Sequence, residues 1–461
     1  MQSPISQGPD HPFQRMNWLI KIYSGFLLCL AQLIRSCPFL FPAKIVRLIR
    51  RSDESFQALR TAESPWIWFH AASGEVEHLR PLFLLFKSRC PHLRLILTLT
   101  SESLLERAQK FEDLDEVHSW TLDTNSAMAK FLSPRPPEMA LIAKSDWWPV
   151  MLHTLAKMNV PIYVVAYFTS SESEQIGFWQ SHFFRWATRN LTTVFGIQEL
   201  PEKLQRNLRC PYEPLGDPRW DQVFFRKSDS IKMPPALASA ANPNLITGVL
   251  ASTWPEDERE LFLLIEKFSH VRWIWAPHEP TEEALAIIER DLAIVGIPSL
   301  KLSQLEGEGK TWSREVLLID RVGVLYETFR LAHFAFVGGS FRSRVHSVLE
   351  PLSHGLVTFI GPYHRNSAEA LQFRQLDGVE DIDFAATPVV ACRTGGELEL
   401  QISALLSSHK DLRSWDALKT RILQKTEALK GASLRIFNRL PIQNFSSDQK
   451  ASRDQNSSSK R

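Results

Sequence analysis

The chain has 461 residues, more than one hydrophobic core usually serves, so its length predicts two domains with smaller appendages. Its 53 Lys and Arg residues nearly balance its 51 Asp and Glu residues, which excludes the broad basic field of a protein that wraps nucleic acid. The five cysteines are odd in number, lie far apart and form no CxxC pair. Neither a disulfide framework nor a zinc knuckle is indicated, and a reducing cytoplasm fits best.

The first element is an apolar segment, WLIKIYSGFLLCLAQLI at residues 18–34, followed by the basic segment FPAKIVRLIRR. A full crossing of a bilayer needs about 20 predominantly apolar residues, so this segment is predicted to be a short membrane helix or a deep interfacial one. The basic residues favour the cytoplasmic, anionic face. A cleaved signal peptide and an amphipathic soluble helix are the competing interpretations. We predict that residues 1–53 form a membrane anchor with a basic segment.

Four apolar strands with intervening helices are predicted in the next part of the chain. The first, WIWFHA, runs into a small-residue turn and then a helix. The other three strands are expected within residues 93–101, 139–146 and 160–168. Unbroken apolar runs that alternate with helices indicate a parallel sheet covered on both faces. We therefore expect an α/β domain over residues 54–222.

A second series of the same type follows and is predicted to form another doubly wound domain, residues 223–440. Its five strands are expected within residues 244–253, 271–278, 315–321, 333–340 and 356–362. Prolines and Gly216 separate the two series near residues 212–223. Tandem domains of this kind predict a ligand cleft at the carboxyl ends of their strands. The polar stretch 441–461 is predicted to be a disordered tail.

Five segments in a fixed order carry a resemblance to a known family. They are FHAASGEVEHLRPL, SDWWPVML, GDPRWDQV, LASTWPEDERE and FVGGSFRSRVHSVLEPLSHGLVTFIGPYHRN. Their order on a tandem doubly wound pattern resembles the bacterial transferases that add Kdo (3-deoxy-D-manno-octulosonic acid) to lipid A, from about His70 to Asn366. The resemblance implies a GT-B fold of two Rossmann-like domains. It also implies a metal-independent, inverting transfer from CMP-Kdo to a lipid A precursor at the cytoplasmic face of the inner membrane, without a cofactor.

The first two segments carry the residues that the resemblance assigns to the acceptor and to catalysis. Glu75 follows a tight turn at a helix start, and a carboxylate there can take the proton of an acceptor hydroxyl. The resemblance assigns this base to Glu75, and Ser73, Gly74, Lys144 and Asp146 are expected to bind the acceptor. The alternative for Glu75 is a helix cap, which contributes up to about 1 kcal/mol.

The fifth segment is the expected donor site. Gly338, Gly339 and Ser340 follow a buried strand, where the backbone can approach a phosphate closely. Ser347 is expected to cap the next helix, and Glu350 to accept hydrogen bonds from ribose hydroxyls. In the family, the Glu that matches Glu350 holds the donor. The alternative for Glu350 is an ordinary carboxylate at a helix start.

Further donor contacts come from the ends of two strands and from a later turn. Ser252 and Thr253 are expected to donate to a phosphate, to cap the next helix, or to do both. The resemblance places four more residues at the nucleotide: Pro277, His278, His346 and Asn366. The alternatives are a surface or satisfied core histidine for His346 and a turn residue for Asn366.

Several positions depart from the family pattern and change charge where an active site normally controls it. The usual Glu-Thr-Glu-Leu-Trp-Pro-Asn is here residues 144–150, so Lys144 replaces a carboxylate. The interpretations for Lys144 are a pair with Glu75, a contact with an acceptor phosphate, or a snorkelling lysine at a strand end. The usual Asn-Ala-Arg is reduced to residues 166–168, the His after Ser-Thr is Trp254, and the double glycine before His346 is Arg344 and Val345. Two further hypotheses follow. They are a GT-B transferase for another nucleotide sugar, and a catalytically silent homologue that binds lipid or a partner enzyme.

Overall fold

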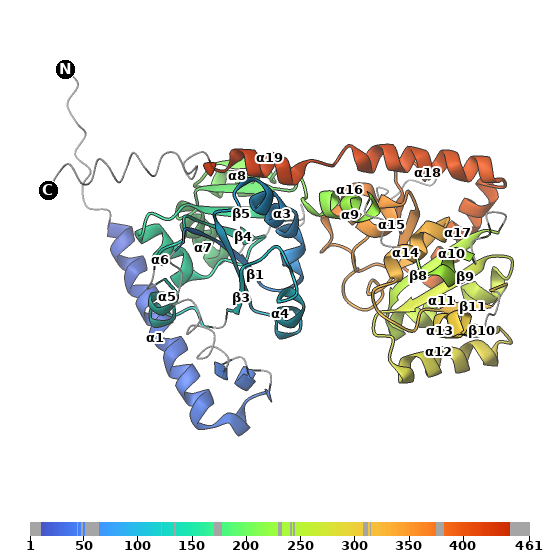
Figure 1. The fold of residues 1–461 in the computed structure, drawn as a ribbon, viewed down its shortest axis with the longest axis horizontal. Coiled ribbons are helices and arrows are strands. Elements are labelled where there is room, and N and C mark those ends of the chain that lie inside the picture. Colours follow the sequence, from blue (N-terminus) through green and yellow to red (C-terminus); the bar gives the residue numbers. More distant parts are fainter. Residues whose placement is uncertain are drawn as a thin grey trace, which may run out of the picture. The chain divides into compact units, whose positions relative to one another are not determined.

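The computed structural model of the chain consists of two compact units (Figure 1). It describes residues 11–43, 45–47, 49–50, 64–120, 122–132, 135–169, 178–228, 233–239, 242, 245–307, 312–313, 315–374 and 382–442. The first unit comprises residues 1–219 and 431–461, and the second comprises residues 220–430. The first unit's main segment ends at Arg219, three residues before the predicted domain boundary at 222/223. Residues 431–440, predicted for the second domain, lie in the first unit. Residues 443–461 of the predicted tail lie outside the described residues.

The first unit is built on a seven-stranded sheet in which every pairing is parallel. The strand order is β3-β2-β1-β4-β5-β6-β7. Their bounds are β1 (Trp66–Ala71), β2 (Arg94–Leu99), β3 (Glu116–Ser119), β4 (Met139–Ala143), β5 (Ile162–Tyr167), β6 (Thr193–Gly196) and β7 (Tyr212–Pro214). The predicted doubly wound sheet is confirmed. The sequence analysis missed β3, β6 and β7.

Helices pack against this sheet over two hydrophobic cores. Alternate residues of β1 enter different cores, Trp66 and Trp68 one and Ile67 and Phe69 the other. This explains the unbroken apolar run, because both faces of the strand are buried. The helical elements after β1 are η3 (Gly74–His78), α3 (Arg80–Arg89), α4 (Glu102–Ala108), α5 (Asn125–Leu132), α6 (Pro149–Lys157), α7 (Phe178–Arg189), α8 (Glu202–Asn207) and α19 (Ala432–Arg439).

The last helix explains why residues 431–440 belong to the first unit. Ile436 and Phe437 of α19, and Leu440 directly after it, are buried in the same core as α3. The ring of Phe437 lies 5.0 Å from that of Phe86 in an edge-on contact. In Figure 1, α19 is the red helix beside α3. The apolar periodicity of residues 432–439 predicts a helix but does not show which domain that helix packs on.

The N-terminal helix α1 (His11–Ser36) has two different apolar faces. One face packs on the first unit, where Ser24 is buried and its Oγ accepts a hydrogen bond from the Asn125 N–H at 3.0 Å. The other face leaves large side chains exposed, among them Trp18 at 64 % and Phe26 at 62 %. Among the described residues, Trp18–Ser36 is long and apolar enough to cross a membrane. The exposed face is compatible with membrane association.

The second unit repeats the architecture with another fully parallel seven-stranded sheet. The order is β10-β11-β9-β8-β12-β13-β14. The strands are β8 (Thr247–Thr253), β9 (Arg272–Pro277), β10 (Ser299–Lys301), β11 (Val316–Leu318), β12 (Phe334–Val337), β13 (Val357–Ile360) and β14 (Val389–Ala391). The second predicted doubly wound sheet is also confirmed, with β10 and β14 as additional strands.

Helices and short helical turns surround the second sheet over one continuous core. They are α9 (Arg219–Ser228), α10 (Pro235–Ser239), α11 (Pro255–Lys267), α12 (Glu282–Ile294), α13 (Leu302–Gly307), α14 (Leu325–Thr328), η5 (Phe329–Leu331), α15 (Leu349–Ser353), α16 (Ala368–Phe373), α17 (Gly395–Ser408) and α18 (Leu412–Glu427). Trp220, at the start of the unit, is buried and packs against Phe224 and Phe373.

Each sheet contains a point where the order of strands reverses. In the first unit β1 pairs with β2 on one side and β4 on the other, and in the second β8 pairs with β9 and β12. Loops that leave the carboxyl ends of such strands diverge, which creates room for a ligand. The first and second sequence segments follow β1 and β4, and the fourth and fifth follow β8 and β12. Four of the five segments therefore lie at the switch points of their own sheets.

Candidate active site

Glu75 lies in η3, directly after the turn that leaves β1. Its Oε2 accepts hydrogen bonds from the Ser73 N–H at 3.0 Å and from the Ser73 hydroxyl at 3.1 Å. Within the described part of the chain, Oε1 makes no hydrogen bond. The half-buried carboxylate thus has one oxygen fixed to its own turn and one oxygen left for another partner. The local capping interaction exists, and the role as base stays a prediction.

The turn before Glu75 has open space above it. A Cβ built on Gly74 would meet no atom of the described chain within 4 Å. The glycine is therefore not required by crowding inside the unit. An acceptor beside Ser73 and Gly74 stays a prediction that this open space permits.

The loop after β4 brings Asp146 next to a histidine that the sequence analysis did not select. The Oδ2 of Asp146 lies 2.9 Å from Nε2 of His70, although the two atoms are not aligned as a hydrogen bond. On the other side of the buried ring, Nδ1 lies 2.7 Å from the Thr98 hydroxyl. Lys144 turns the chain out of β4 in the left-handed region, at φ 54°. That conformation costs an L-residue about 1–2 kcal/mol, and such strain concentrates at functional sites.

Asp123 fixes the helix that follows this loop. Its two oxygens accept hydrogen bonds from the N–H groups of Val150 and Met151, at 2.7 and 2.8 Å, at the start of α6. The side chain is completely buried, and burial raises the pKa of Asp123 to about 7 against the effect of these two donors. Asp123 was missed by the sequence analysis. The only signal was an Asp within a short polar stretch, Asp-Thr-Asn.

The third segment, GDPRWDQV, joins the two units and serves the fold. Asp217 is buried and pairs with Arg219 through two guanidinium nitrogens, at 3.0 and 2.6 Å. Its Oδ1 lies 3.8 Å from Nε2 of His78 in η3. Gly216 adopts φ 95°, which favours glycine. This segment therefore braces the Glu75 element from the end of the first unit.

In the second unit, the buried carboxylate of Asp257 joins the loops after β8 and β12. It accepts hydrogen bonds from the N–H groups of Trp254 at 2.9 Å, Gly339 at 2.7 Å and Phe341 at 2.9 Å. Burial raises the pKa of Asp257, while these donors oppose the shift. The sequence analysis missed Asp257, although an Asp three residues after Trp254 is typical of a reciprocal helix cap.

The glycines after β12 are explained by close packing of these two loops. A Cβ on Gly338 would collide with the backbone of Ser252, and one on Gly339 with the backbone oxygen of Arg344. Gly339 also has φ 77°. The buried Ser340 hydroxyl donates to the Val337 carbonyl and accepts the Gly361 N–H. The Gly339 N–H already donates to Asp257. The predicted approach of this loop to a phosphate stays a prediction.

The residues at the end of β8 serve the packing of the second unit. The buried Thr253 hydroxyl donates to Glu258 at 3.1 Å and accepts the Trp275 indole N–H at 2.8 Å. Ser252 is half-buried with φ 53°. Helix α11 begins with Trp254, not with Ser252 or Thr253, as its N-cap residue. The capping interpretation of these two hydroxyls is therefore wrong.

A cluster of rings lies above the ends of β8 and β9. The Trp254 and His278 rings have centroids 4.7 Å apart, and the His278 and His346 rings stack at 4.3 Å. The indole Nε1–H of Trp254 donates to Nε2 of His346 at 3.0 Å. The Arg342 guanidinium covers the Trp254 ring at 3.9 Å. Burial, His278 and two arginines lower the pKa of His346 to about 4. Pro277 ends β9 directly before this cluster and is buried.

Glu350 lies in the first turn of α15, where it pairs with a residue from another helix. Its Oε1 accepts a hydrogen bond from Arg226 of α9 at 3.2 Å. Ser347 accepts the Leu349 N–H at 3.3 Å, although the N-cap residue of α15 is Val348. The ribose contact of Glu350 stays a prediction, and a nucleotide there would meet the Glu350–Arg226 pair.

Asn366 lies at a small pocket beside the fifth segment. Its Nδ2 donates to the Val345 carbonyl at 3.2 Å. The pocket has a volume of about 410 Å³ and is lined by Ser343, Pro362, Tyr363, Arg365 and Asn366. Asn366 therefore supports the loop that leads to His346 and also faces a cavity large enough for part of a small ligand.

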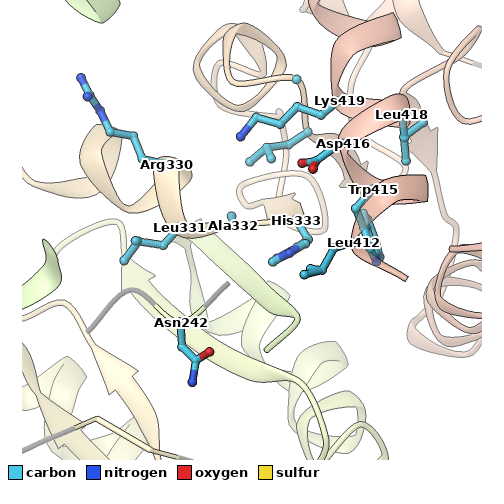
Figure 2. Close-up of a pocket in the computed structure, with 12 residues that line it drawn as sticks. Asn242, Arg330, Leu331, Ala332, His333, Leu412, Trp415, Asp416, Leu418 and Lys419 are labelled. Carbon is cyan, nitrogen blue, oxygen red and sulfur yellow. The ribbon is translucent and has the colours of Figure 1, made fainter. Parts of the chain in front are cut away.

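A second pocket, of about 260 Å³, lies at the opposite, amino-terminal edge of the second sheet (Figure 2). His333 precedes β12, and its Nδ1 accepts the Thr247 N–H at 3.1 Å. In Figure 2, Asp416 and Lys419 extend from α18 at the side of this histidine. The residues predicted for the site are absent from its lining. It is separate from the switch point of the sheet.

Two Rossmann-like units with polar loops at both switch points define a GT-B glycosyltransferase, and comparison with known proteins agrees. The family model for 3-deoxy-D-manno-octulosonic-acid transferase matches residues 49–222. The Haemophilus influenzae (strain Rd) transferase of that name is 25% identical over 406 residues, which cover 84% of this chain and 90% of the relative. That of Chlamydia trachomatis serovar A is 24% identical over 329 residues, 65% of this chain and 71% of the relative.

A solved glycosyltransferase from Rickettsia africae shares the fold, with a TM-score of 0.52 at 8% sequence identity. The match covers 81% of this chain and 97% of that chain. The chain is thus similar to Kdo transferases, through a family model over residues 49–222 and through relatives of 24% and 25% identity.

Proposed function

We propose that the protein transfers Kdo from CMP-Kdo to a lipid A precursor in lipopolysaccharide biosynthesis. The observation that carries the proposal is the Glu75 carboxylate at the switch point of the first sheet. One of its oxygens is fixed by Ser73, and the other makes no hydrogen bond in the described chain, beside the open space at Gly74. The named relatives are transferases of the same sugar.

In the proposed reaction Glu75 takes the proton of an acceptor hydroxyl as its oxygen attacks the anomeric carbon of Kdo. The new carbon–oxygen bond forms while the bond from that carbon to the CMP phosphate oxygen breaks, and CMP leaves with the bonding electrons. A single displacement of this kind inverts the anomeric centre. The fixed Oε2 orients the carboxylate, which leaves Oε1 to receive the proton.

The proposed donor site lies in the second unit. Its proposed ligand, CMP-Kdo, is an anion. CMP-Kdo carries a phosphate and a carboxylate, and Arg342 and Arg344 are exposed beside the ring cluster. Guanidinium groups bind such anions with charge-assisted hydrogen bonds. Arg344 stands at one of the two glycines that are usual in the family before His346, so this chain has an additional positive charge at the proposed donor site.

The lipid acceptor fits a protein held at the cytoplasmic face of the inner membrane. The exposed apolar face of α1 and the basic segment after it support this location. Arg47 and Arg50 are exposed, whereas Lys44 and Arg51 lie outside the described residues. Because α1 also packs on the first unit, a clean test replaces exposed Trp18 and Phe26 with Ser. We expect release from membranes in fractionation, with Leu263→Ser, an exposed change in the second unit, as the control.

A donor panel tests the proposed reaction. Full-length protein and a lipid A precursor are incubated with CMP-Kdo, a UDP-sugar or a GDP-sugar, and lipid products are identified by mass spectrometry. We expect product with CMP-Kdo alone. Product from another sugar would instead support the second hypothesis, which the ammonium of Lys144 in place of the family carboxylate favours. Absence of any product together with absence of nucleotide binding would contradict both.

A further inference from the structure

The ring cluster of the second unit assigns a role to Trp254, which stands where the family usually has His. We infer that Trp254 is a positioning residue that holds His346 as a neutral imidazole with its proton on Nδ1. His346 then presents a neutral N–H donor to an anionic oxygen of the nucleotide-sugar donor. This second part rests on the proposed function, because it requires that the second unit binds that donor.

The hydrogen bond between the two rings determines where the proton of His346 lies. The Trp254 Nε1 and the His346 Nε2 are 3.0 Å apart. An indole nitrogen donates and never accepts, so Nε2 must offer its lone pair. A neutral imidazole whose Nε2 accepts carries its proton on Nδ1. An imidazolium would place a second N–H against the indole N–H, so the bond also excludes the charged ring.

The surroundings of His346 fix the ring and oppose its protonation. Its stack with His278 has an interplanar angle of 13°. A Cβ on Gly339 would approach the His346 ring to about 3.0 Å, so the glycine lets the ring lie against the loop. Arg342 and Arg344 add positive charge nearby, and together with burial they lower the pKa of His346 to about 4. The charged form is therefore disfavoured by two independent features.

The ring nitrogen that remains is Nδ1, which makes no hydrogen bond within the described residues. An Nδ1–H is a donor suited to a phosphate or carboxylate oxygen, whereas the positive charge for the same ligand comes from the arginines. A histidine at position 254 would donate or accept according to its own tautomer. It would leave the tautomer of His346 undetermined, and Trp254 removes this freedom.

The tautomer is measured directly by ¹⁵N NMR of full-length protein labelled at its 14 histidines. His346 is assigned by comparison with His346→Asn. We expect wild-type His346 to be the neutral Nδ1–H form at pH 7 and to stay neutral at pH 5. In Trp254→Phe, which keeps the stack but removes the N–H, we expect a mixture of the two neutral tautomers, because burial and the arginines still oppose protonation. A wild-type signal with the proton on Nε2, or an unchanged signal in Trp254→Phe, would refute the positioning role.

Calorimetry with CMP tests the consequence for the ligand. Loss of a fixed hydrogen-bond donor should weaken CMP binding by about fivefold in Trp254→Phe. Trp312→Phe is the matched control, because it removes an indole N–H that donates to the Glu315 carbonyl elsewhere in the second unit. We expect the control to bind CMP like the wild type. A changed tautomer with unchanged CMP affinity would overturn the ligand contact. Wild-type protein that does not bind CMP would overturn the proposed donor site while the NMR result still decides the role of Trp254.

Discussion

The loops at the two switch points have the same place in their sheets but use their carboxylates differently. In the first unit, Glu75 bonds only to Ser73 of its own turn and keeps one oxygen without a hydrogen bond in the described chain. In the second unit, both oxygens of Asp257 accept hydrogen bonds, from three backbone N–H groups in two loops. The first arrangement suits a group that exchanges a proton. The second suits a preformed surface that binds a ligand with little rearrangement.

The charged side chains near the two switch points also differ. The first switch point has the half-buried Glu75 and Asp146 together with one cation, Lys144, whereas Arg342 and Arg344 are exposed at the second. A general base needs a carboxylate, and an anionic donor needs fixed positive charge. The family assignment and these charges together favour a division of labour between the units, which the following experiments can break or sharpen.

Glu75→Gln should have the largest effect, and it should fall on turnover alone. Loss of a general base typically lowers the rate by about 100-fold to 10,000-fold. Gln keeps an acceptor oxygen for the Ser73 bonds, so stability should change by less than about 1 kcal/mol. CMP binding, which the account assigns to the second unit, should stay as in wild type. Single-turnover kinetics and calorimetry on one preparation measure both quantities, and a loss of CMP affinity equal to the loss of rate would break the division.

Asp257→Ala should affect the second unit instead, through its fold. Three backbone N–H groups lose their buried acceptor, and each such loss costs about 1 kcal/mol or more. We expect the unfolding free energy of the second unit to fall by roughly 3 kcal/mol, with weaker CMP binding. Hydrogen exchange, measured at increasing denaturant concentration, reports the stability of each unit on its own. Equal loss of protection around β1 and β8 would show that Asp257 does not act locally.

The long central strands and the motif loops could be predicted from the sequence, but the edge strands and β6, which lies beside the edge strand β7, could not. β1, β4, β8 and β12 are unbroken apolar runs, because helices cover both faces. β3 reads Glu-Val-His-Ser and β14 is only three residues long, so neither has a periodic signal. Edge strands are defined by their neighbours in the sheet, which a local pattern does not contain.

The site residues that could be predicted are those that belong to a recognisable sequence motif. The sequence placed Glu75 and the glycine loop at the strand ends, where the structure has them. It missed His70, Asp123, Asp257 and Arg226, because each acts on a partner 27 to 124 positions away in the chain or through buried backbone groups. It also explained Gly338 by a phosphate, whereas close packing against Ser252 is sufficient.

Glu350→Gln should have a smaller effect, limited to donor affinity. The pair between Glu350 and Arg226 is partly exposed, and such pairs contribute at most about 1 kcal/mol to stability. Loss of a charged acceptor for the ribose should raise the Kd for CMP by about tenfold. Asp221→Asn, a neutralised carboxylate on α9, is the control. Calorimetry that finds the same Kd for Glu350→Gln and wild type would remove Glu350 from the donor site.

A pH dependence of stability is expected in the first unit. Burial raises the pKa of Asp123 to about 7, above its unfolded value near 4. The folded state then holds the proton more tightly, so this contribution to stability is fully present below about pH 4 and is lost as the pH rises through about 7. Asp123→Asn cannot titrate and should lack this slope. Denaturant unfolding of wild type and variant at pH 4.5 and 7.5 measures it, and parallel pH profiles would show that Asp123 does not titrate in this range.

The central claim is that this chain transfers Kdo with a base from its first unit. The most direct measurement incubates purified full-length protein with CMP-Kdo and a lipid A precursor and follows the lipid by mass spectrometry, for wild type and Glu75→Gln side by side. We expect addition of Kdo by the wild type and none by Glu75→Gln in the same time. Equal product from both proteins, or no product from a wild type that binds CMP, would contradict it.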